Sequence, residues 1–126
     1  MTEEKNILIV DDEESVAFFL SENLSALTPN YSVKTAYSGE EALGKVAVEA
    51  FDLVVTDLRM PGLNGLELIQ QVRALQPKTQ AILITAYGND DIQNTAHHLG
   101  ACCYITKPFK MEQFTHMVYA ILQAKA

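Results

Sequence analysis

Short apolar or alternating runs are separated by amphipathic stretches along almost the whole chain. The runs lie at residues 6–10, 33–36, 53–55, 81–84 and 101–105. Runs of this length, bounded by turn-forming residues, predict β-strands, and the stretches between them repeat their apolar positions every three to four residues, as helices do. Five strands that alternate with five helices predict right-handed crossovers and a parallel sheet with helices on both faces. The pattern therefore predicts an α/β fold, a three-layer sandwich.

The predicted helices have defined faces and ends. The first helix should bury one face, formed by Val16, Phe19, Leu20, Asn23, Leu24 and Leu27. The last helix should bury Phe114, Val118, Ile121 and Leu122. Ser38 and Glu41 have the spacing of a capping box, in which each side chain satisfies a backbone amide at the start of a helix. Asn89 fits the N-cap of the fourth helix, and Gly100 fits its C-terminal end.

The composition of the strands indicates which of them are central. The first, third and fourth runs are uniformly apolar, which is typical of strands that are covered on both faces. The second and fifth runs are more polar or mixed, so we expect them at the edges of the sheet.

Length and charge limit the kinds of protein that the sequence can encode. At 126 residues the chain predicts a single domain spanning 1–126. Its net charge of −7 argues against direct binding of nucleic acid, which needs a basic surface. No apolar run approaches the roughly 18 residues of a membrane span, and the first residues lack the basic and then apolar segment of a signal peptide. We therefore expect a cytoplasmic protein with no membrane contact.

The cysteines and histidines do not have the spacing of metal ligands. Cys102 and Cys103 are adjacent, so in an extended segment they should point to opposite faces and form no disulfide with each other. We interpret them as buried or half-buried thiols. His97 and His98 are also neighbours, and we expect them, like His116, at the surface.

Polar residues gather where the predicted strands end. Asp11 and Asp12 follow the first strand, and Asp57 follows the third. Thr85 closes the fourth strand, and Lys107 lies just beyond the fifth. Because the carboxyl ends of parallel strands share one edge of the sheet, these residues should meet in one crevice. A single strand-end aspartate is usually a turn or helix cap, and Asp12 or Glu13 could still cap the first helix, but capping does not explain the whole set.

The chemistry that suits this crevice is phosphoryl transfer assisted by a cation. Carboxylates that are crowded together raise one another's pKa, and burial adds to this effect. A hard divalent cation such as Mg²⁺, which prefers carboxylate, water and phosphate oxygens, relieves the repulsion. Lys107 is a compact positive charge that suits a phosphoryl oxygen, and Thr85 offers a hydroxyl. The set predicts a phosphate site in which one carboxylate can itself be the nucleophile.

Four segments, in order along the chain, resemble one known family. They are "ILIVDDEE", "DLVVTDLRMPGLNGLEL", "AILITAYG" and "GACCYITKPF". Together they resemble the receiver domains of bacterial two-component response regulators, across essentially the whole chain. The resemblance implies a flavodoxin-like fold with a five-stranded parallel sheet in the order 2-1-3-4-5. It also implies a phosphorylation-controlled signalling switch rather than an enzyme with turnover.

The resemblance assigns roles to the residues at the strand ends. Asp57 matches the phosphoacceptor, which takes its phosphoryl group from a sensor histidine kinase or a phosphotransfer protein. Asp11 and Asp12 match the acids that bind Mg²⁺, together with Asp57 and the backbone carbonyl of Arg59. Lys107 matches the lysine that contacts the phosphoryl group.

The resemblance also implies a conformational response. Thr85 and Tyr104 match a switch pair, in which the hydroxyl moves to a phosphate oxygen and the aromatic ring rotates inward. The surface of the fourth helix, the fifth strand and the fifth helix should change as a result. We expect this surface to act on a fused or separate output domain and to support a homodimer after phosphorylation. The bond between Lys107 and Pro108 matches one that is cis in the family.

Some positions depart from patterns that are common in the family. Cys103 stands where a small or acidic residue is frequent, and Lys110 stands where an acidic or capping residue often precedes the last helix. The last helix also lacks the arginine-rich pattern of the winged-helix transcription factors. Tyr87, two residues after Thr85, could shield the aspartyl phosphate from an attacking water, or could simply cover the rim of the helix.

Two other interpretations are an enzyme and a cofactor-binding protein. A haloacid-dehalogenase-like phosphohydrolase also has a nucleophilic aspartate at a strand end with Mg²⁺, but usually as D-x-D after the first strand, whereas Asp11 and Asp12 are adjacent. A flavodoxin-like nucleotide or flavin binder would need a glycine-rich loop after the first strand, where this chain has four acidic residues. Turnover of phosphate esters would favour the enzyme, and stoichiometric labelling of Asp57 would favour the receiver.

Overall fold

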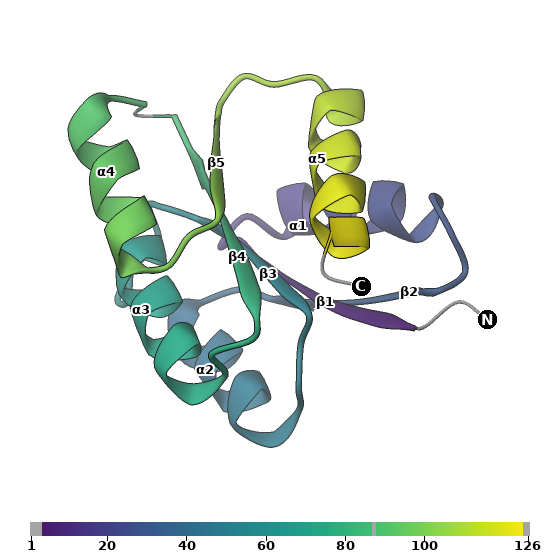
Figure 1. The fold of residues 1–126 in the computed structure, drawn as a ribbon, viewed down its shortest axis with the longest axis horizontal. Helices are drawn as coiled ribbons and strands as arrows, with labels where there is room; N and C mark the ends of the chain where they lie inside the picture. Colours follow the sequence, from purple (N-terminus) through teal and green to yellow (C-terminus); the bar gives the residue numbers. More distant parts are fainter. Residues whose placement is uncertain (1–3, 87, 125–126) are drawn as a thin grey trace.

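The computed structural model describes residues 4–86 and 88–124, in which strands and helices alternate (Figure 1). The strands are β1 (Lys5–Val10), β2 (Tyr31–Ala36), β3 (Leu53–Asp57), β4 (Gln80–Thr85) and β5 (Cys103–Thr106). The helices are α1 (Glu14–Ser25), α2 (Gly39–Val48), α3 (Gly65–Leu75), α4 (Asp90–Leu99) and α5 (Met111–Ala124). None of the described helices is long and apolar enough to cross a membrane.

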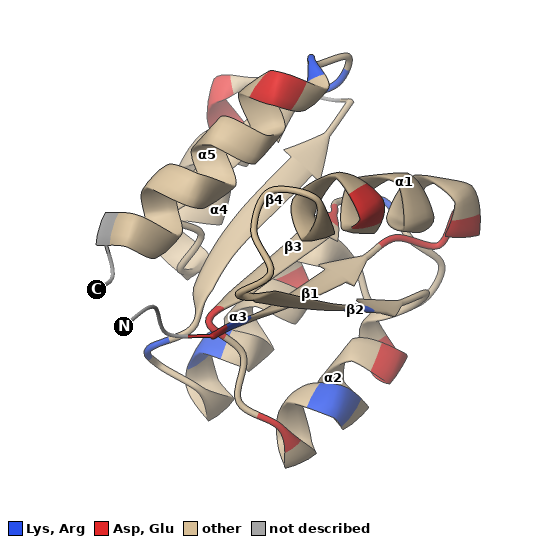
Figure 2. Cartoon of the chain, turned by 90° about the vertical axis from the view of Figure 1, so that its right-hand side faces the viewer, with Lys and Arg blue, Asp and Glu red and all other residues tan. Residues whose placement is uncertain are grey.

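All five strands are parallel and lie in the order β2-β1-β3-β4-β5, which confirms the predicted sheet. The apolar strands β1, β3 and β4 are central, and β2 and β5 form the edges, also as predicted. Helices α1 and α5 pack on one face of the sheet, while α2, α3 and α4 pack on the other (Figure 1). Figure 2 shows α1 and α5 on one side of the strands and α2 and α3 on the other. The carboxyl ends of the strands therefore all point the same way and lie together at one end of a sheet that helices cover on both faces.

Helix α1 buries a different stripe from the predicted one. Its buried side chains are Ala17, Leu20 and Leu24, which recur at helical spacing and belong to the core on that face of the sheet. Phe19, predicted to be buried, is 58% exposed, and Leu27 lies beyond the end of the helix and is also exposed. The apolar run is wider than one helical face, so the small side chain of Ala17 can lie against the sheet while larger ones point outward. In α5, Phe114, Val118 and Leu122 are buried as predicted, while Ile121 is only partly buried against the same core.

Side chains cap the starts of α2, α3 and α4. The Oγ of Ser38 accepts a hydrogen bond of 3.0 Å from the Glu41 amide. The Glu41 carboxylate, however, accepts from the amide of Tyr37 instead of that of Ser38, so the predicted capping box is only half formed. A complete capping box starts α3, between Asn64 and Glu67. The caps predicted for α4 are confirmed at both ends.

Cys102 and Cys103 are free thiols at the start of β5. Cys103 is half-buried as predicted, but Cys102 is exposed, so the prediction was wrong for that residue. Cys102 precedes the strand, and its amide donates to the Ala81 carbonyl. The three histidines are exposed, as predicted.

Candidate functional site

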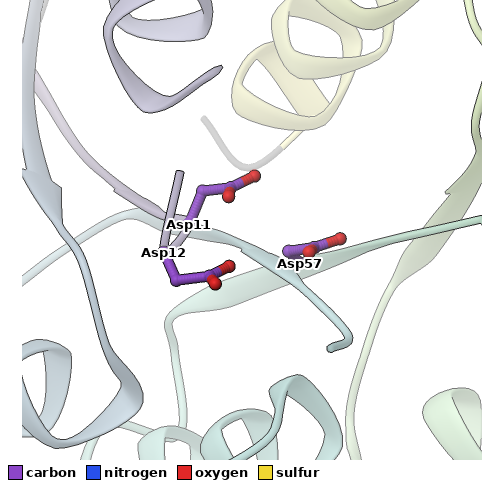
Figure 3. A group of neighbouring side chains, drawn as sticks. All are labelled: Asp11, Asp12 and Asp57. Carbon is purple, nitrogen blue, oxygen red and sulfur yellow. The ribbon is translucent and has the colours of Figure 1, made fainter. Parts of the chain in front are cut away.

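The carboxyl ends of β1 and β3 bring three aspartates together. Asp57 is the last residue of β3, and Asp11 and Asp12 follow β1 directly. The two strands are paired in parallel register, which places their ends side by side. One carboxylate oxygen from each aspartate lies within 4.8 Å of the other two, and the three side chains extend in the same direction (Figure 3). The predicted meeting of these acids is confirmed.

Asp11 is deeply buried, with 2% of its surface exposed. Its Oδ1 accepts a hydrogen bond of 2.9 Å from the Glu13 amide, which holds the carboxylate at the start of α1. Glu13 occupies the N-cap position of α1, but its side chain makes no cap hydrogen bond, so the alternative in which the side chain of Asp12 or Glu13 caps this helix is wrong. Burial raises the pKa of Asp11 to about 6, because the loss of hydration outweighs the Glu13 hydrogen bond, and the nearby charge of Asp57 adds to the rise.

Asp57 is partly buried, with 13% of its side chain exposed, and it lies beside a lysine. The Nζ of Lys107 is 3.3 Å from the Oδ1 of Asp57. Burial nevertheless raises the pKa of Asp57 above its ordinary value, and the Lys107 charge offsets this only in part. Lys107 therefore offsets only part of the cost of burying the ionised Asp57.

Thr85 and Lys107 reach the same edge from β4 and β5. Thr85 is the last residue of β4 and is buried. The Lys107 amide donates to the Thr85 carbonyl at 2.8 Å, which ties the connection after β5 to the end of β4. The Lys107–Pro108 bond is cis, as predicted. The acids, the ammonium and the hydroxyl thus come from four neighbouring strand ends.

The remaining predicted residues lie around this cluster. Tyr104 is half-buried on β5, and a methyl group added at Gly88 would lie 3.2 Å from its hydroxyl oxygen, so the loop after β4 passes close to the hydroxyl. Arg59 lies in the loop after β3 with its side chain exposed, and the role of its carbonyl stays a prediction. Tyr87 lies outside the described residues, and its shielding role stays a prediction.

Two residues near the cluster were not predicted from the sequence. Gly65, the first residue of α3, is so close to Asp57 that an added Cβ would lie 2.3 Å from the Asp57 carbonyl oxygen. Glu40, in the first turn of α2, accepts a hydrogen bond of 3.1 Å from the Leu63 amide in the loop after β3. A glycine just inside a helix, where helix propensity disfavours it, was the one available signal for Gly65. Glu40 had no such signal.

The three aspartates fit a hard divalent cation such as Mg²⁺. Carboxylate oxygens are ligands that Mg²⁺ prefers, and it usually takes one or two of them, with water and phosphate oxygens completing the shell. The raised pKa values of Asp11 and Asp57 reflect buried negative charge that a cation would stabilise. Asp12 is exposed, so the site is open to ions and to a phosphoryl donor.

Comparisons with known proteins agree with this arrangement. Residues 7–119 match the family described as the response regulator receiver domain. Response regulator ArlR from Staphylococcus haemolyticus is 40% identical over 118 residues, which cover 94% of this chain and 52% of the relative. The chain thus spans about half the length of this curated relative.

Solved structures lead to the same family. A CheY-like receiver domain protein from Methanospirillum hungatei superposes with a TM-score of 0.91 at 28% identity and covers 98% of this chain and 97% of that one. A response regulator from Burkholderia pseudomallei, solved with a phosphorylated aspartic acid and a calcium ion, has a TM-score of 0.81 at 30% identity and covers 93% of this chain and 72% of that one. The family match favours the receiver over the phosphohydrolase and the cofactor binder. The chain belongs to the receiver domains of two-component response regulators.

Proposed function

We propose that this domain accepts a phosphoryl group on Asp57 from a sensor histidine kinase or a phosphotransfer protein, in a Mg²⁺-dependent reaction. The observation that carries the proposal is the cluster of three carboxylates within 4.8 Å, with the Lys107 ammonium 3.3 Å from Asp57. The similar protein from B. pseudomallei, which contains a phosphorylated aspartic acid and a calcium ion, supports it. The domain then acts as a regulatory switch rather than as an enzyme with turnover.

In the transfer, a carboxylate oxygen of Asp57 attacks the phosphorus of the donor phosphohistidine. A phosphorus–oxygen bond forms, the phosphorus–nitrogen bond breaks, and the imidazole leaves with the electron pair of that bond. Asp11, Asp12, Asp57 and the Arg59 carbonyl would hold Mg²⁺, which supplies positive charge opposite the phosphoryl oxygens. Lys107, already beside Asp57, adds further positive charge.

Two further residues can respond to the new charge. A phosphoryl group adds nearly two negative charges, and its oxygens can attract the Thr85 hydroxyl from the strand next to that of Asp57. Tyr104 lies on the strand beyond, close to Gly88 in the loop that follows Thr85, so movement of this loop would change the space open to its ring. We infer that Thr85 and Tyr104 form the switch and that α4, β5 and α5 carry the output surface.

The output itself belongs to a fused or separate output domain in this proposal. The chain covers 52% of the matched ArlR, which leaves room in such proteins for a second domain. We infer that the phosphorylated output surface also supports a homodimer. The net charge of −7 favours control of a partner over direct binding of nucleic acid by this domain.

Incubation with acetyl phosphate tests the proposed function directly. In the presence of Mg²⁺, intact mass should show one added phosphoryl group that is lost on standing and that maps to Asp57, and EDTA should prevent its formation. Steady release of phosphate from esters such as p-nitrophenyl phosphate, with no adduct, would instead support a phosphohydrolase. A label at any residue other than Asp57 would also contradict the proposal.

Exposed aromatic rings near the cluster offer a docking surface for the donor protein. Phe18 and Phe19 on α1 are 65% and 58% exposed. Phe19 lines a groove of about 780 Å³ together with Lys107 and Phe109 from the connection after β5. Large exposed apolar side chains beside such a groove are typical of protein-binding surfaces. Because Lys107 also contacts Asp57, we infer that the donor packs against α1 while its phosphohistidine reaches the cluster.

The Phe19→Ala variant should slow transfer from the cognate kinase by about tenfold or more, the effect expected when an aromatic anchor is removed from an interface. Transfer from acetyl phosphate should be unchanged, because a small donor needs no docking surface. Val48→Ala, at an 87% exposed position on α2, is the matched control and should behave as the parent with both donors. Equal slowing of Phe19→Ala with both donors would show that the ring supports the site or the fold instead.

A further inference from the structure

The loop between β3 and α3, residues 58–64, directly follows Asp57 and carries Arg59, whose carbonyl is a proposed Mg²⁺ ligand. Backbone hydrogen bonds fix its start, since Leu58 donates to the Ile84 carbonyl and accepts from the first amide of α3. Most of the loop lines an open hollow of about 570 Å³. The conformation of the loop therefore depends on the contacts along its other side.

That other side rests on the first turn of α2. The Oε2 of Glu40 accepts a hydrogen bond of 3.1 Å from the Leu63 amide. The same carboxylate lies against Gly62, where an added Cβ would be 2.8 Å from Oε2 and where a φ of +77° also favours glycine. Gly39 packs equally closely, since an added Cβ there would be 2.8 Å from the Leu63 Cβ. The helix and the loop are thus in close contact, with the Glu40 carboxylate between them.

We propose that Glu40 is a positioning residue for the metal site: it holds loop 58–64 in place and thereby keeps the Arg59 carbonyl available to Mg²⁺. Glu40 acts through the loop and is not itself a ligand. The inference rests on the proposed function, because it assigns Glu40 a task in the same cation site. A loop that already has its bound conformation loses little freedom when the ion binds. Without the hydrogen bond to Leu63, the loop has the metal-binding conformation in only a fraction of the molecules. The apparent affinity for Mg²⁺ is then reduced to that fraction of its full value.

The neighbouring Glu41 provides a matched control. It is also an exposed acid in the first turn of α2, so its removal changes the net charge by the same amount. Its carboxylate accepts from the Tyr37 amide at 2.9 Å and so supports the connection from β2 rather than loop 58–64. A difference between variants at Glu40 and at Glu41 therefore reports the contact with the loop and not the charge.

Calorimetric titration with Mg²⁺ at constant ionic strength tests the proposal. We expect Glu40→Ala to bind Mg²⁺ about three- to tenfold more weakly than Glu41→Ala. Glu40→Gln should fall between Glu40→Ala and the parent, because its amide oxygen can still accept from Leu63. In Mg²⁺-free buffer, hydrogen exchange of the Leu63 amide should be faster in Glu40→Ala than in Glu41→Ala.

Equal Mg²⁺ affinities of Glu40→Ala and Glu41→Ala would overturn the proposal, and so would unchanged exchange at Leu63. If Glu40→Ala does not fold, Glu40→Gln and Glu41→Gln decide by the same criteria. If the parent is phosphorylated at Asp57 but the Glu40 and Glu41 variants bind Mg²⁺ with equal affinity, only the role of Glu40 is refuted. If the parent binds Mg²⁺ but is never phosphorylated, the proposed function is refuted. The role of Glu40 is then still decided by the difference in Mg²⁺ affinity between the Glu40 and Glu41 variants. A parent that binds no Mg²⁺ overturns both.

Discussion

The Asp57→Asn variant should take up no phosphoryl group and, in Mg²⁺-free buffer at neutral pH, should melt at a higher temperature than the parent. The first result follows because a carboxamide lacks the nucleophilic carboxylate oxygen. The second follows from the raised pKa of Asp57, since the fold disfavours the ionised form despite Lys107 at 3.3 Å. Asparagine resembles the neutral acid in size and shape. We expect the melting temperature to rise by about 2–5 °C, which corresponds to roughly 1 kcal/mol in a domain of this size.

This gain should grow with pH. A carboxyl group whose pKa is higher in the folded than in the unfolded protein stabilises the fold below its unfolded pKa, and that contribution is lost as pH rises through the folded pKa. For Asp11, with a pKa raised from 3.8 to about 6, the loss begins near pH 4 and is complete only above pH 6. The pKa of Asp57 is shifted in the same direction. The advantage of Asp57→Asn should therefore be smaller at pH 4 than at pH 7.

Melting curves between pH 4 and pH 8, with and without Mg²⁺, check this prediction. Mg²⁺ above its dissociation constant should stabilise the parent and reduce the advantage of the variant. Asp91→Asn removes the same charge from an exposed position in the first turn of α4 and should gain no stability, because an acid there favours the helix N-terminus. An Asp57→Asn variant that melts below the parent at pH 7 without Mg²⁺ would show that the ion pair with Lys107 outweighs the crowding of the acids.

The acidic cluster could be predicted from the sequence because it depends on few properties of the chain. The apolar runs define the strands, and right-handed crossovers make the sheet parallel, so the carboxyl ends of the strands share one edge. Asp11 and Asp57 reach that edge because each stands at the end of a buried strand, whatever packs around it. The order of the strands needed the family resemblance as well, because alternation of strands and helices alone allows other orders.

The contacts that surround the cluster could not be predicted in the same way. In α1, residues 16–20 are all apolar, so their periodicity does not define which face is buried. The pattern selected the large ring of Phe19, whereas the fold buries Ala17, whose small side chain allows the helix to lie close to the sheet. The hydrogen bond between α2 and loop 58–64 joins residues 23 positions apart, and nothing local in either segment indicates it. Such contacts follow from the packed fold and not from a pattern.

Gly65→Ala should destabilise the fold more than any other change proposed near the site. Its Cβ would lie 2.3 Å from the Asp57 carbonyl oxygen and 3.0 Å from the Leu58 Cα, both of them main-chain atoms. Neither atom can turn away as a flexible side chain would, so the end of β3 or the start of α3 must move. The movement would also strain the 2.9 Å hydrogen bond from the Gly65 amide to the Leu58 carbonyl. We expect a loss of about 3 kcal/mol and a fall in melting temperature of roughly 10 °C.

Urea unfolding of Gly65→Ala beside Gly44→Ala measures this effect against a matched control. An added Cβ at Gly44, within α2, meets no atom within 4 Å, so Gly44→Ala should be more stable than the parent by about 0.5–1 kcal/mol. Because Asp57 is the last residue of β3 and its carbonyl forms this contact, the folded fraction of Gly65→Ala should also bind Mg²⁺ more weakly. Most surface substitutions change the free energy of unfolding by less than about 1 kcal/mol. If the free energy of unfolding of Gly65→Ala differs from that of the parent by no more than this, the close approach of α3 to β3 is not what fixes Asp57 in the cluster.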